Sequence, residues 1–158
     1  MSNKPNRIIF HHTGDLTKTA QAEKVNAYHK SKEFPISLLG YFGGYHYFIE
    51  RDGAIKQFRL DEEIGAHDGE ENINSIGVAL AGNFDLEQPT GEQERAVAAL
   101  LDQLLTRWKI PLARIEPHRW GDQTNCPGKL LNDYWPRVAY LKHKANWITK
   151  FLSWNGLN

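Results

Sequence analysis

Short apolar runs along the chain predict the strands of a sheet. Residues 7–12, RIIFHH, form one such run and are typical of a buried strand. Residues 75–81, SIGVALA, are apolar on both faces, which favours a central strand. Residues 45–57, YHYFIERDGAIKQ, predict a β-hairpin, because Asp52-Gly53 accepts the positive φ that a tight turn requires.

Helical periodicity follows in three segments. Residues 17–32 are polar and free of glycine, with apolar residues or histidine at helical spacing. The clearest helix begins after Thr90, which can form a capping box with Gln93, and continues as an apolar stripe to Trp108. Residues 133–154 also have the pattern of a helix.

One domain accounts for the whole pattern. A last short strand is predicted at residues 115–118, and no repeat, linker or low-complexity segment divides the chain. The length of 158 residues suits a single hydrophobic core. We therefore expect one α/β domain over residues 1–158, with a central mixed β-sheet flanked by helices and a helical extension from about residue 133.

Charge and cysteine content exclude several classes of protein. Nineteen basic residues balance nineteen acidic ones, so neither a nucleic acid nor an anionic membrane is indicated as the main partner. The single cysteine excludes an internal disulfide. The first residues contain too short an apolar run for a signal peptide, and no stretch approaches a transmembrane helix. We expect a chain that is made in the cytoplasm.

The only cysteine, Cys126, lies in the polar segment HRWGDQTNCPG, an unusual place for a buried structural thiol. Two of the seven histidines, His11 and His118, are expected at strand ends. Two histidines and a thiolate match the three protein ligands of a catalytic zinc site. A structural zinc ion would need a fourth ligand, and copper would usually add a methionine. The spacing alone leaves open that these histidines are ordinary polar or core residues.

Four segments of the chain resemble, in the same order, the zinc-dependent N-acetylmuramoyl-L-alanine amidases. That family includes small phage lysozyme-like amidases and the animal peptidoglycan recognition proteins. The segments are IIFHHTG, GYHYFIERDG, GAHDGEENINSIGVALAGNF and HRWGDQTNCPG. The resemblance implies an amidase-like fold and one zinc ion per chain, with His11, His118 and Cys126 as the ligands. Because successive strand side chains face opposite sides, His12 is expected to pack beneath the sheet or to support the site.

The resemblance also implies an activity and further site residues. The reaction would be hydrolysis of the amide between N-acetylmuramic acid and the L-alanine of the peptidoglycan stem peptide. Tyr45 and Thr124 would be catalytic, by orienting water or by stabilising the developing oxyanion. The expected substrate-binding residues are His46, His67 and Asn74. The group that protonates the leaving amine is not identified.

Three biological contexts fit this resemblance. The first is a phage endolysin, a monomer that reaches the cell wall through a holin-type pore. The second is a bacterial cytosolic amidase that recycles wall fragments, but that branch has a glutamate at the position of Ala79 and an aspartate as third ligand. The third is a non-catalytic module that only binds peptidoglycan, and some such relatives lack the cysteine that is present here. We expect the first, with peptidoglycan as partner.

The tail of the chain has two interpretations. Apolar side chains recur at helical spacing, and three lysines are expected on the opposite side; they are Trp147, Ile148, Phe151, Leu152, Lys142, Lys144 and Lys150. The helix could dock on the domain and close its core, or it could lie at a bacterial membrane surface. We expect docking.

Overall fold

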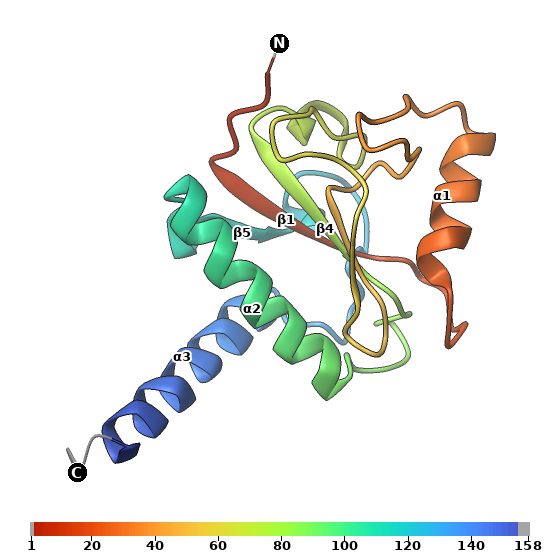
Figure 1. The fold of residues 1–158 in the computed structure, drawn as a ribbon. Helices are drawn as coiled ribbons and strands as arrows, with labels where there is room; N and C mark the ends of the chain where they lie inside the picture. The colour runs from red at the N-terminus through yellow and green to blue at the C-terminus, as the bar shows by residue number, and fades with distance from the viewer. Residues whose placement is uncertain (1, 155–158) are drawn as a thin grey trace.

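Five strands form a mixed sheet in the order β3-β2-β4-β1-β5 (Figure 1). The computed structural model describes residues 2–154. The strands are β1 (Arg7–His12), β2 (Tyr47–Ile49), β3 (Ile55–Gln57), β4 (Ser75–Leu80) and β5 (Ile115–Pro117). β1, β2, β4 and β5 are parallel, and only the β2–β3 hairpin is antiparallel. The prediction that residues 75–81 form a central strand is confirmed, since β4 is the middle strand of the sheet.

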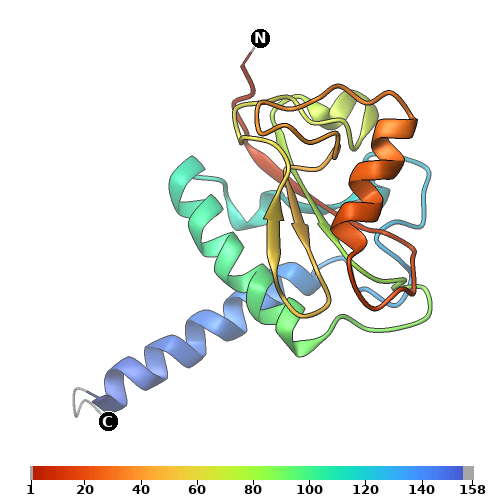
Figure 2. The same ribbon diagram turned by 45° about the vertical axis from the view of Figure 1, so that its right-hand side comes forward.

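Helices cover both faces of this sheet. In the described residues the α-helices are α1 (Gln21–Ser31), α2 (Gly91–Trp108) and α3 (Trp135–Trp154), and three short 3₁₀ helices are η1 (Gly69–Asn72), η2 (Leu112–Arg114) and η3 (His118–Trp120). Figure 2 shows the sheet between α1 on one side and α2 on the other. The fold is the predicted single α/β domain with a mixed sheet flanked by helices.

The two faces of β4 differ in side-chain size. Large side chains alternate with small ones along SIGVAL, and all six residues are buried. Ile76, Val78 and Leu80 join the main core, which includes the apolar stripe of α2. Ala79 belongs to a smaller core on the α1 side. Because successive strand side chains face opposite sides, Ser75 and Gly77 also face α1 and leave space above the sheet there.

Local signals in the sequence explain the best-predicted elements. Thr90 and Gln93 form the capping box, with each backbone N–H donating to the other residue's side chain at 3.0 and 3.1 Å. Each of these hydrogen bonds satisfies a backbone N–H that would otherwise be unpaired at the start of the helix. In the hairpin, Gly53 has φ of 85°, and the Glu50 N–H donates to the Ala54 carbonyl at 2.9 Å. Both predictions are confirmed.

Other boundaries differ from the prediction. α1 begins at Gln21 rather than at residue 17, because the Asp15 carboxylate accepts hydrogen bonds from the backbone and hydroxyl of Thr17 and holds a turn. The last strand ends at Pro117. His118 therefore opens the short helix η3 instead of ending the strand, and the Gly121 N–H closes that turn on the His118 carbonyl at 3.0 Å.

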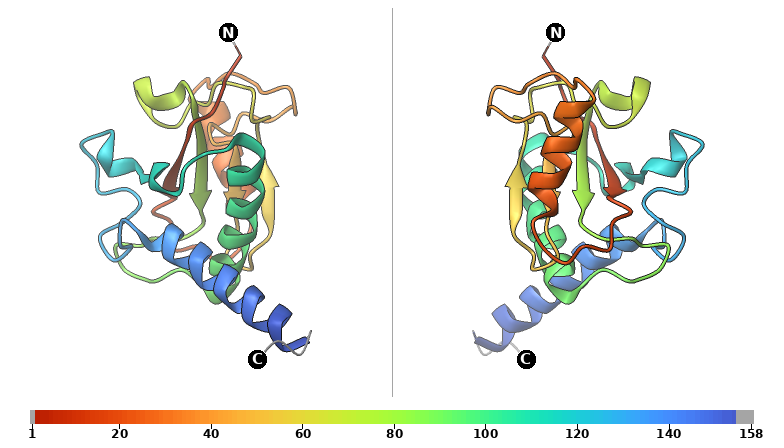
Figure 3. Two further views of the ribbon diagram at one scale, coloured as in Figure 1. Left: turned by 90° about the vertical axis from the view of Figure 1, so that its left-hand side faces the viewer. Right: turned by 90° about the vertical axis from the view of Figure 1, so that its right-hand side faces the viewer.

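The helix α3 is docked along its first half only. Pro136 and Ala139 are buried, and the Lys144 ammonium lies 2.8 Å from the Asp102 carboxylate of α2. Every residue from Ala145 to Trp154 is exposed, and Figure 3 shows this part of α3 projecting from the domain. The expectation that the whole helix docks is wrong for this half, and Lys144 faces α2 rather than the side away from the apolar residues. Within the described residues, no helix is both long and apolar enough to cross a bilayer.

Candidate metal centre and active site

Three side chains from distant parts of the chain meet near the carboxyl end of β1. Ligand atoms of His11, His118 and Cys126 all lie within 4.8 Å of one another. His11 is in β1, His118 directly follows β5, and Cys126 lies in the loop beyond η3. Because β1 and β5 are parallel neighbours, their carboxyl ends meet at the same edge of the sheet. The structure thus brings together the three residues that were expected to bind zinc.

The His11-His12 pair divides its two side chains between the faces of the sheet. His11 is buried on the α1 side, with Nδ1 at 3.9 Å from the Cys126 sulfur. His12 faces the other side, where its Nδ1 accepts the Phe84 N–H at 3.1 Å. The backbone N–H of His12 donates to the Cys126 sulfur at 3.4 Å. The two side chains face opposite sides as expected, and the metal-binding role of His11 with His12 in support stays a prediction.

Neither nitrogen of the His118 ring makes a hydrogen bond in the described residues, although Nε2 lies at ion-pair distance from two carboxylates. Nε2 lies 3.3 Å from Oδ1 of the buried Asp68 and 3.5 Å from the more exposed Asp122 carboxylate. Nδ1 is buried and has no hydrogen-bond partner in the described part of the chain. A carboxylate beside one ring nitrogen commonly orients a histidine whose other nitrogen binds a metal. The residues present therefore fit a zinc ion.

Burial dominates the electrostatics of this group. Burial, and then the neighbouring His67 and His118, lower the pKa of His11 well below its usual value. Burial raises the pKa of the Cys126 thiol to about 12. The protein alone thus holds His11 neutral, which is the form that binds metals, and keeps the thiol protonated. A bound cation reverses the preference of the thiol, because it stabilises the thiolate directly.

The loop that carries Cys126 is held by hydrogen bonds to its backbone. The Thr124 hydroxyl accepts the Cys126 N–H at 3.1 Å, and the Arg119 N–H donates to the Cys126 carbonyl at 2.9 Å. The Arg119 guanidinium donates to the carbonyls of Gly128 and Leu131 at 3.0 and 2.7 Å. Thr124 therefore shapes the turn that presents the thiol, and its catalytic role stays a prediction.

The His67 ring contacts His11, the first of the expected metal ligands. Its Nδ1 lies 3.1 Å from Nε2 of His11, and its Nε2 lies 3.4 Å from the Ser75 hydroxyl. Gly77 makes this position possible, since a Cβ there would lie 2.4 Å from the His67 ring. His67 also borders a cavity, and the substrate contact that was expected of it stays a prediction.

Tyr45 lies at the boundary between the three-residue group and that cavity. Its ring centroid is 5.1 Å from that of His11. Burial, and next the Cys126 thiol, raise the pKa of its phenol, so the hydroxyl stays protonated. In residues 2–154 no hydrogen bond is made by this hydroxyl. The cavity has a volume of about 390 Å³ and is bordered also by Phe34, Asp68 and Asn72.

The expected substrate contact of His46 is wrong, and that of Asn74 stays a prediction. His46 is completely buried; its Nδ1 accepts the Gly77 N–H at 3.0 Å, and its Nε2 lies 2.9 Å from the Glu63 carbonyl. No surface of this side chain is left for a substrate. Asn74 lies just before β4 with φ of 62°, its N–H donates to Asn3 at 2.8 Å, and it borders neither of the two cavities that Asp68 lines.

Asp68 is the site residue that the sequence analysis missed. Three acidic residues follow His67 within four positions: Asp68, Glu70 and Glu71. Only the fold shows which of them meets His118. The Asn72 side chain fixes this segment by accepting the N–H groups of His67 and Asp68 at 2.7 and 3.0 Å. Burial of the Asp68 carboxyl raises its pKa.

Comparisons with known proteins show similarity in both sequence and fold. The family model described as N-acetylmuramoyl-L-alanine amidase matches residues 1–129. The solved structure of the N-acetylmuramoyl-L-alanine amidase LysC from Clostridium intestinale URNW is 31% identical, covers 90% of this chain and 87% of that chain, and has a TM-score of 0.73.

Two curated proteins represent two kinds of relative. Peptidoglycan-recognition protein SC2 of Drosophila melanogaster is 31% identical over 136 residues, which are 81% of this chain and 71% of that protein. The endolysin of Escherichia phage T7 is 31% identical over 99 residues, which are 60% of this chain and 64% of that protein. The family match ends before α3 begins.

Proposed function

The chain belongs to the N-acetylmuramoyl-L-alanine amidase family, and on that premise we propose that it is a zinc-dependent peptidoglycan hydrolase. The bond cleaved is the amide between N-acetylmuramic acid and the L-alanine of the stem peptide. One observation carries the proposal: His11, His118 and Cys126 bring their ligand atoms within 4.8 Å, and the buried Nδ1 of His118 has no partner among the described residues.

Each surrounding residue has a defined task in this proposal. The zinc ion would be held by His11, His118 and Cys126. It would act as a Lewis acid that polarises a carbonyl oxygen and activates water at neutral pH. His67 and Asp68 orient the imidazoles of His11 and His118 through the nitrogens that face away from the metal.

Tyr45 is the proposed donor to the developing oxyanion. Its raised pKa keeps the proton on the phenol, and its hydroxyl has no competing hydrogen bond in the described residues. A donor that is fixed in place before the reaction stabilises the transition state without reorganisation. Thr124 shapes the loop that holds Cys126 and is the second proposed contact of the reacting oxygen.

The cavity beside Tyr45 is the proposed binding place of the stem peptide. It adjoins the three-residue group, and it combines the apolar ring of Phe34 with polar groups of His67 and Asn72. Such a lining suits a short peptide that has both methyl groups and amides.

The proposed biological context is phage lysis, with the enzyme acting on the cell wall after release through a holin-type pore. The similarity to the phage T7 endolysin supports this context. The presence of Cys126 argues against a module that only binds peptidoglycan, and Ala79 argues against the wall-recycling branch.

Defined muropeptides and purified sacculi test the function. Mass analysis should find a free stem peptide that begins with L-alanine and a glycan with an intact lactyl group. Clearing of sacculi should stop with a chelator and return with zinc. Binding to sacculi without these products would identify a recognition module, and products from another bond would overturn the proposed reaction.

A further inference from the structure

The projecting half of α3 exposes an unusual concentration of large apolar side chains. Within eight residues, the exposed fractions are 58% for Trp147, 50% for Ile148, 48% for Phe151, 38% for Leu152 and 90% for Trp154. The rings of Trp147 and Phe151 stack with centroids 5.5 Å apart. We call these five residues the aromatic patch. An exposed apolar cluster of this kind commonly marks a binding surface.

The aromatic patch occupies one side of the helix. At 3.6 residues per turn, its five side chains fall within an arc of roughly 160°. The remaining arc carries Asn146, Thr149, Lys150 and Ser153. A helix that separates apolar and polar side chains in this way suits a boundary between water and an apolar phase.

The charge of α3 indicates which apolar phase this is. The 20 residues of the helix include Arg137, Lys142, Lys144 and Lys150 but no aspartate or glutamate. Lys142 lies 3.6 Å from Glu94 and Lys144 lies 2.8 Å from Asp102, both in α2. In the described residues no acidic side chain pairs with Lys150. Exposed ion pairs contribute little to stability, so Lys142 and Lys144 can exchange their acidic partners for lipid phosphates.

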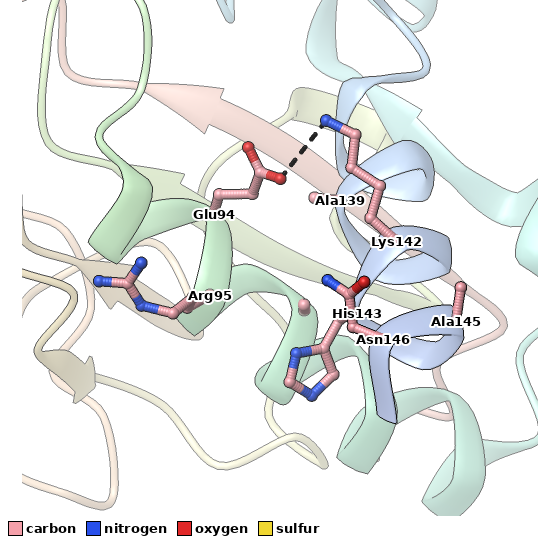
Figure 4. Close-up of a pocket in the computed structure, with 8 residues that line it drawn as sticks. Glu94, Arg95, Ala139, Lys142, His143, Ala145 and Asn146 are labelled. Atoms are coloured by element: carbon pink, nitrogen blue, oxygen red, sulfur yellow. Dashed lines mark ion pairs between the residues drawn. The ribbon is translucent and has the colours of Figure 1, made fainter. Parts of the chain in front are cut away.

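Another cavity lies where α3 crosses α2, next to the aromatic patch. Its volume is about 390 Å³, and its lining includes Arg95, Lys142, His143 and Asn146, with Glu94 as the single acidic residue. Figure 4 shows the Lys142–Glu94 ion pair at one side of the cavity, with Arg95 and His143 beside it. These nitrogen groups offer donors to an anionic headgroup at the point where the helix leaves the domain.

We infer that the projecting half of α3 binds the surface of a membrane that contains anionic lipids. The helix lies in the plane of the interface, with the aromatic patch at the boundary between headgroups and acyl chains and with Lys142 and Lys150 at the phosphates. A second copy of the chain is a poorer occupant, because two α3 helices without acidic residues repel each other. The helix does not span the bilayer.

This surface is separate from the proposed active site. The three-residue group lies on the α1 side of the sheet, whereas α3 packs on α2. Membrane binding therefore adds a place of action to the proposed reaction and does not alter its chemistry.

Cosedimentation of the full zinc-loaded chain with lipid vesicles tests the inference. Vesicles of phosphatidylethanolamine and phosphatidylglycerol should bind the chain at least about tenfold more tightly than vesicles of phosphatidylcholine. The double variant Trp147→Ala/Trp154→Ala should bind at least about tenfold more weakly. The matched control is Thr149→Ala/Ser153→Ala on the other arc of the helix, and it should bind like the wild type. Hydrolysis of soluble muropeptides should be the same for all three chains.

Three results would overturn the inference: no binding to the anionic vesicles, full binding by the double tryptophan variant, or a stable wild-type dimer that this variant dissociates. Vesicle binding requires no substrate. A wild-type chain that binds vesicles but does not hydrolyse muropeptides would therefore support this inference and contradict the proposed function.

Discussion

The candidate metal centre and the projecting half of α3 both depart from the usual distribution of side chains, and they do so in opposite directions. At the centre, Nδ1 of His118 and an oxygen of Asp68 are buried without a hydrogen-bond partner in the described residues. In α3, Trp154 keeps 90% of its surface exposed. Folded chains normally pair buried polar groups and bury large apolar ones. Each region therefore indicates a partner of its own kind, a cation for the first and an apolar surface for the second.

The two regions also differ in their support. The candidate metal centre lies on the sheet and is bordered by His67, Asp68 and the loop to which Arg119 donates hydrogen bonds. An unpaired buried polar group costs about 1–3 kcal/mol, and the surrounding core tolerates that cost. The aromatic patch lies on a helix that leaves the domain. Substitutions at the centre should change the chemistry, whereas substitutions in α3 should change the location of the enzyme.

The largest effect is expected for Cys126→Ser. An alcohol is a much poorer zinc ligand than a thiolate, so the variant should lose most of its zinc, and kcat/KM should fall by more than about 10³-fold. Metal analysis and product analysis check this. The double tryptophan variant of α3 is the control and should keep its zinc. Full zinc occupancy and full activity in Cys126→Ser would remove the thiolate from the ligand set.

The Tyr45→Phe variant separates catalysis from metal binding. Loss of one donor to the oxyanion should reduce kcat by about 10²-fold. The zinc content and the melting temperature should stay close to the wild-type values, because the ring remains in place. Steady-state kinetics on a defined muropeptide measures the effect. An unchanged kcat would limit Tyr45 to packing against the substrate.

Two aspartates beside His118 give a matched pair. The Asp68 side chain is only 2% exposed, whereas that of Asp122 is 61% exposed. Asp68→Asn should weaken zinc binding by about 10-fold to 100-fold, a common effect when the carboxylate behind a ligand histidine is lost. Asp122→Asn should change zinc affinity little, because solvent screens its charge. Competition with a chelator measures both, and equal effects would argue against orientation by Asp68.

The stability of the protein should decrease in mild acid through His29. Burial lowers the pKa of His29 to about 4, below its ordinary value of 6.5. The unfolded chain therefore binds more protons between these values, so the stabilisation is complete above pH 6.5 and is lost as the pH falls towards 4. His29→Asn should flatten this part of the melting profile. Its polar side chain keeps an acceptor for the Gly44 N–H, which His29 binds at 2.9 Å. An unchanged slope would assign the acid sensitivity to other groups.

The smallest effect is expected when the projecting half of α3 is removed. Deletion from Ala145 onwards takes away residues that are all exposed as far as Trp154, so the melting temperature should change by less than about 2 °C. Calorimetry measures this, and vesicle binding should be lost in the same chain. A decrease of many degrees would show that this segment packs on the domain in solution.

Elements with a strong local signal were predictable from the sequence. The run SIGVALA predicts a central strand, because large and small residues alternate and every side chain is apolar or small. The capping box likewise lies within four residues, Thr90 to Gln93. The predicted end of the last strand, His118, was wrong by one residue. The point at which α3 stops contacting the domain depends on the position of α2, which no local sequence signal gives.

The candidate site was predictable only in part. The three proposed metal ligands came from a resemblance in four short motifs, and the fold brings them together. His46 was wrong as a substrate contact, because nearness in sequence to Tyr45 does not determine where a side chain points. Asp68 was missed for the same reason, since its contact with His118 joins segments 50 residues apart in the chain.

The position of β1 in the sheet also determines when its strand pairs can form during synthesis. This strand is made first, yet its neighbours in the sheet are β4 and β5. Ile8 can therefore pair only after Ile76, and then Ile115, have been synthesised. At a translation rate of about 5–20 residues per second, the ribosome needs roughly 5–20 seconds to make the chain between Ile8 and Ile115. A nascent chain therefore carries His11 for most of its synthesis without His118 and Cys126, the other two proposed metal ligands. Under the proposed function, metal capture would therefore be a late step of synthesis.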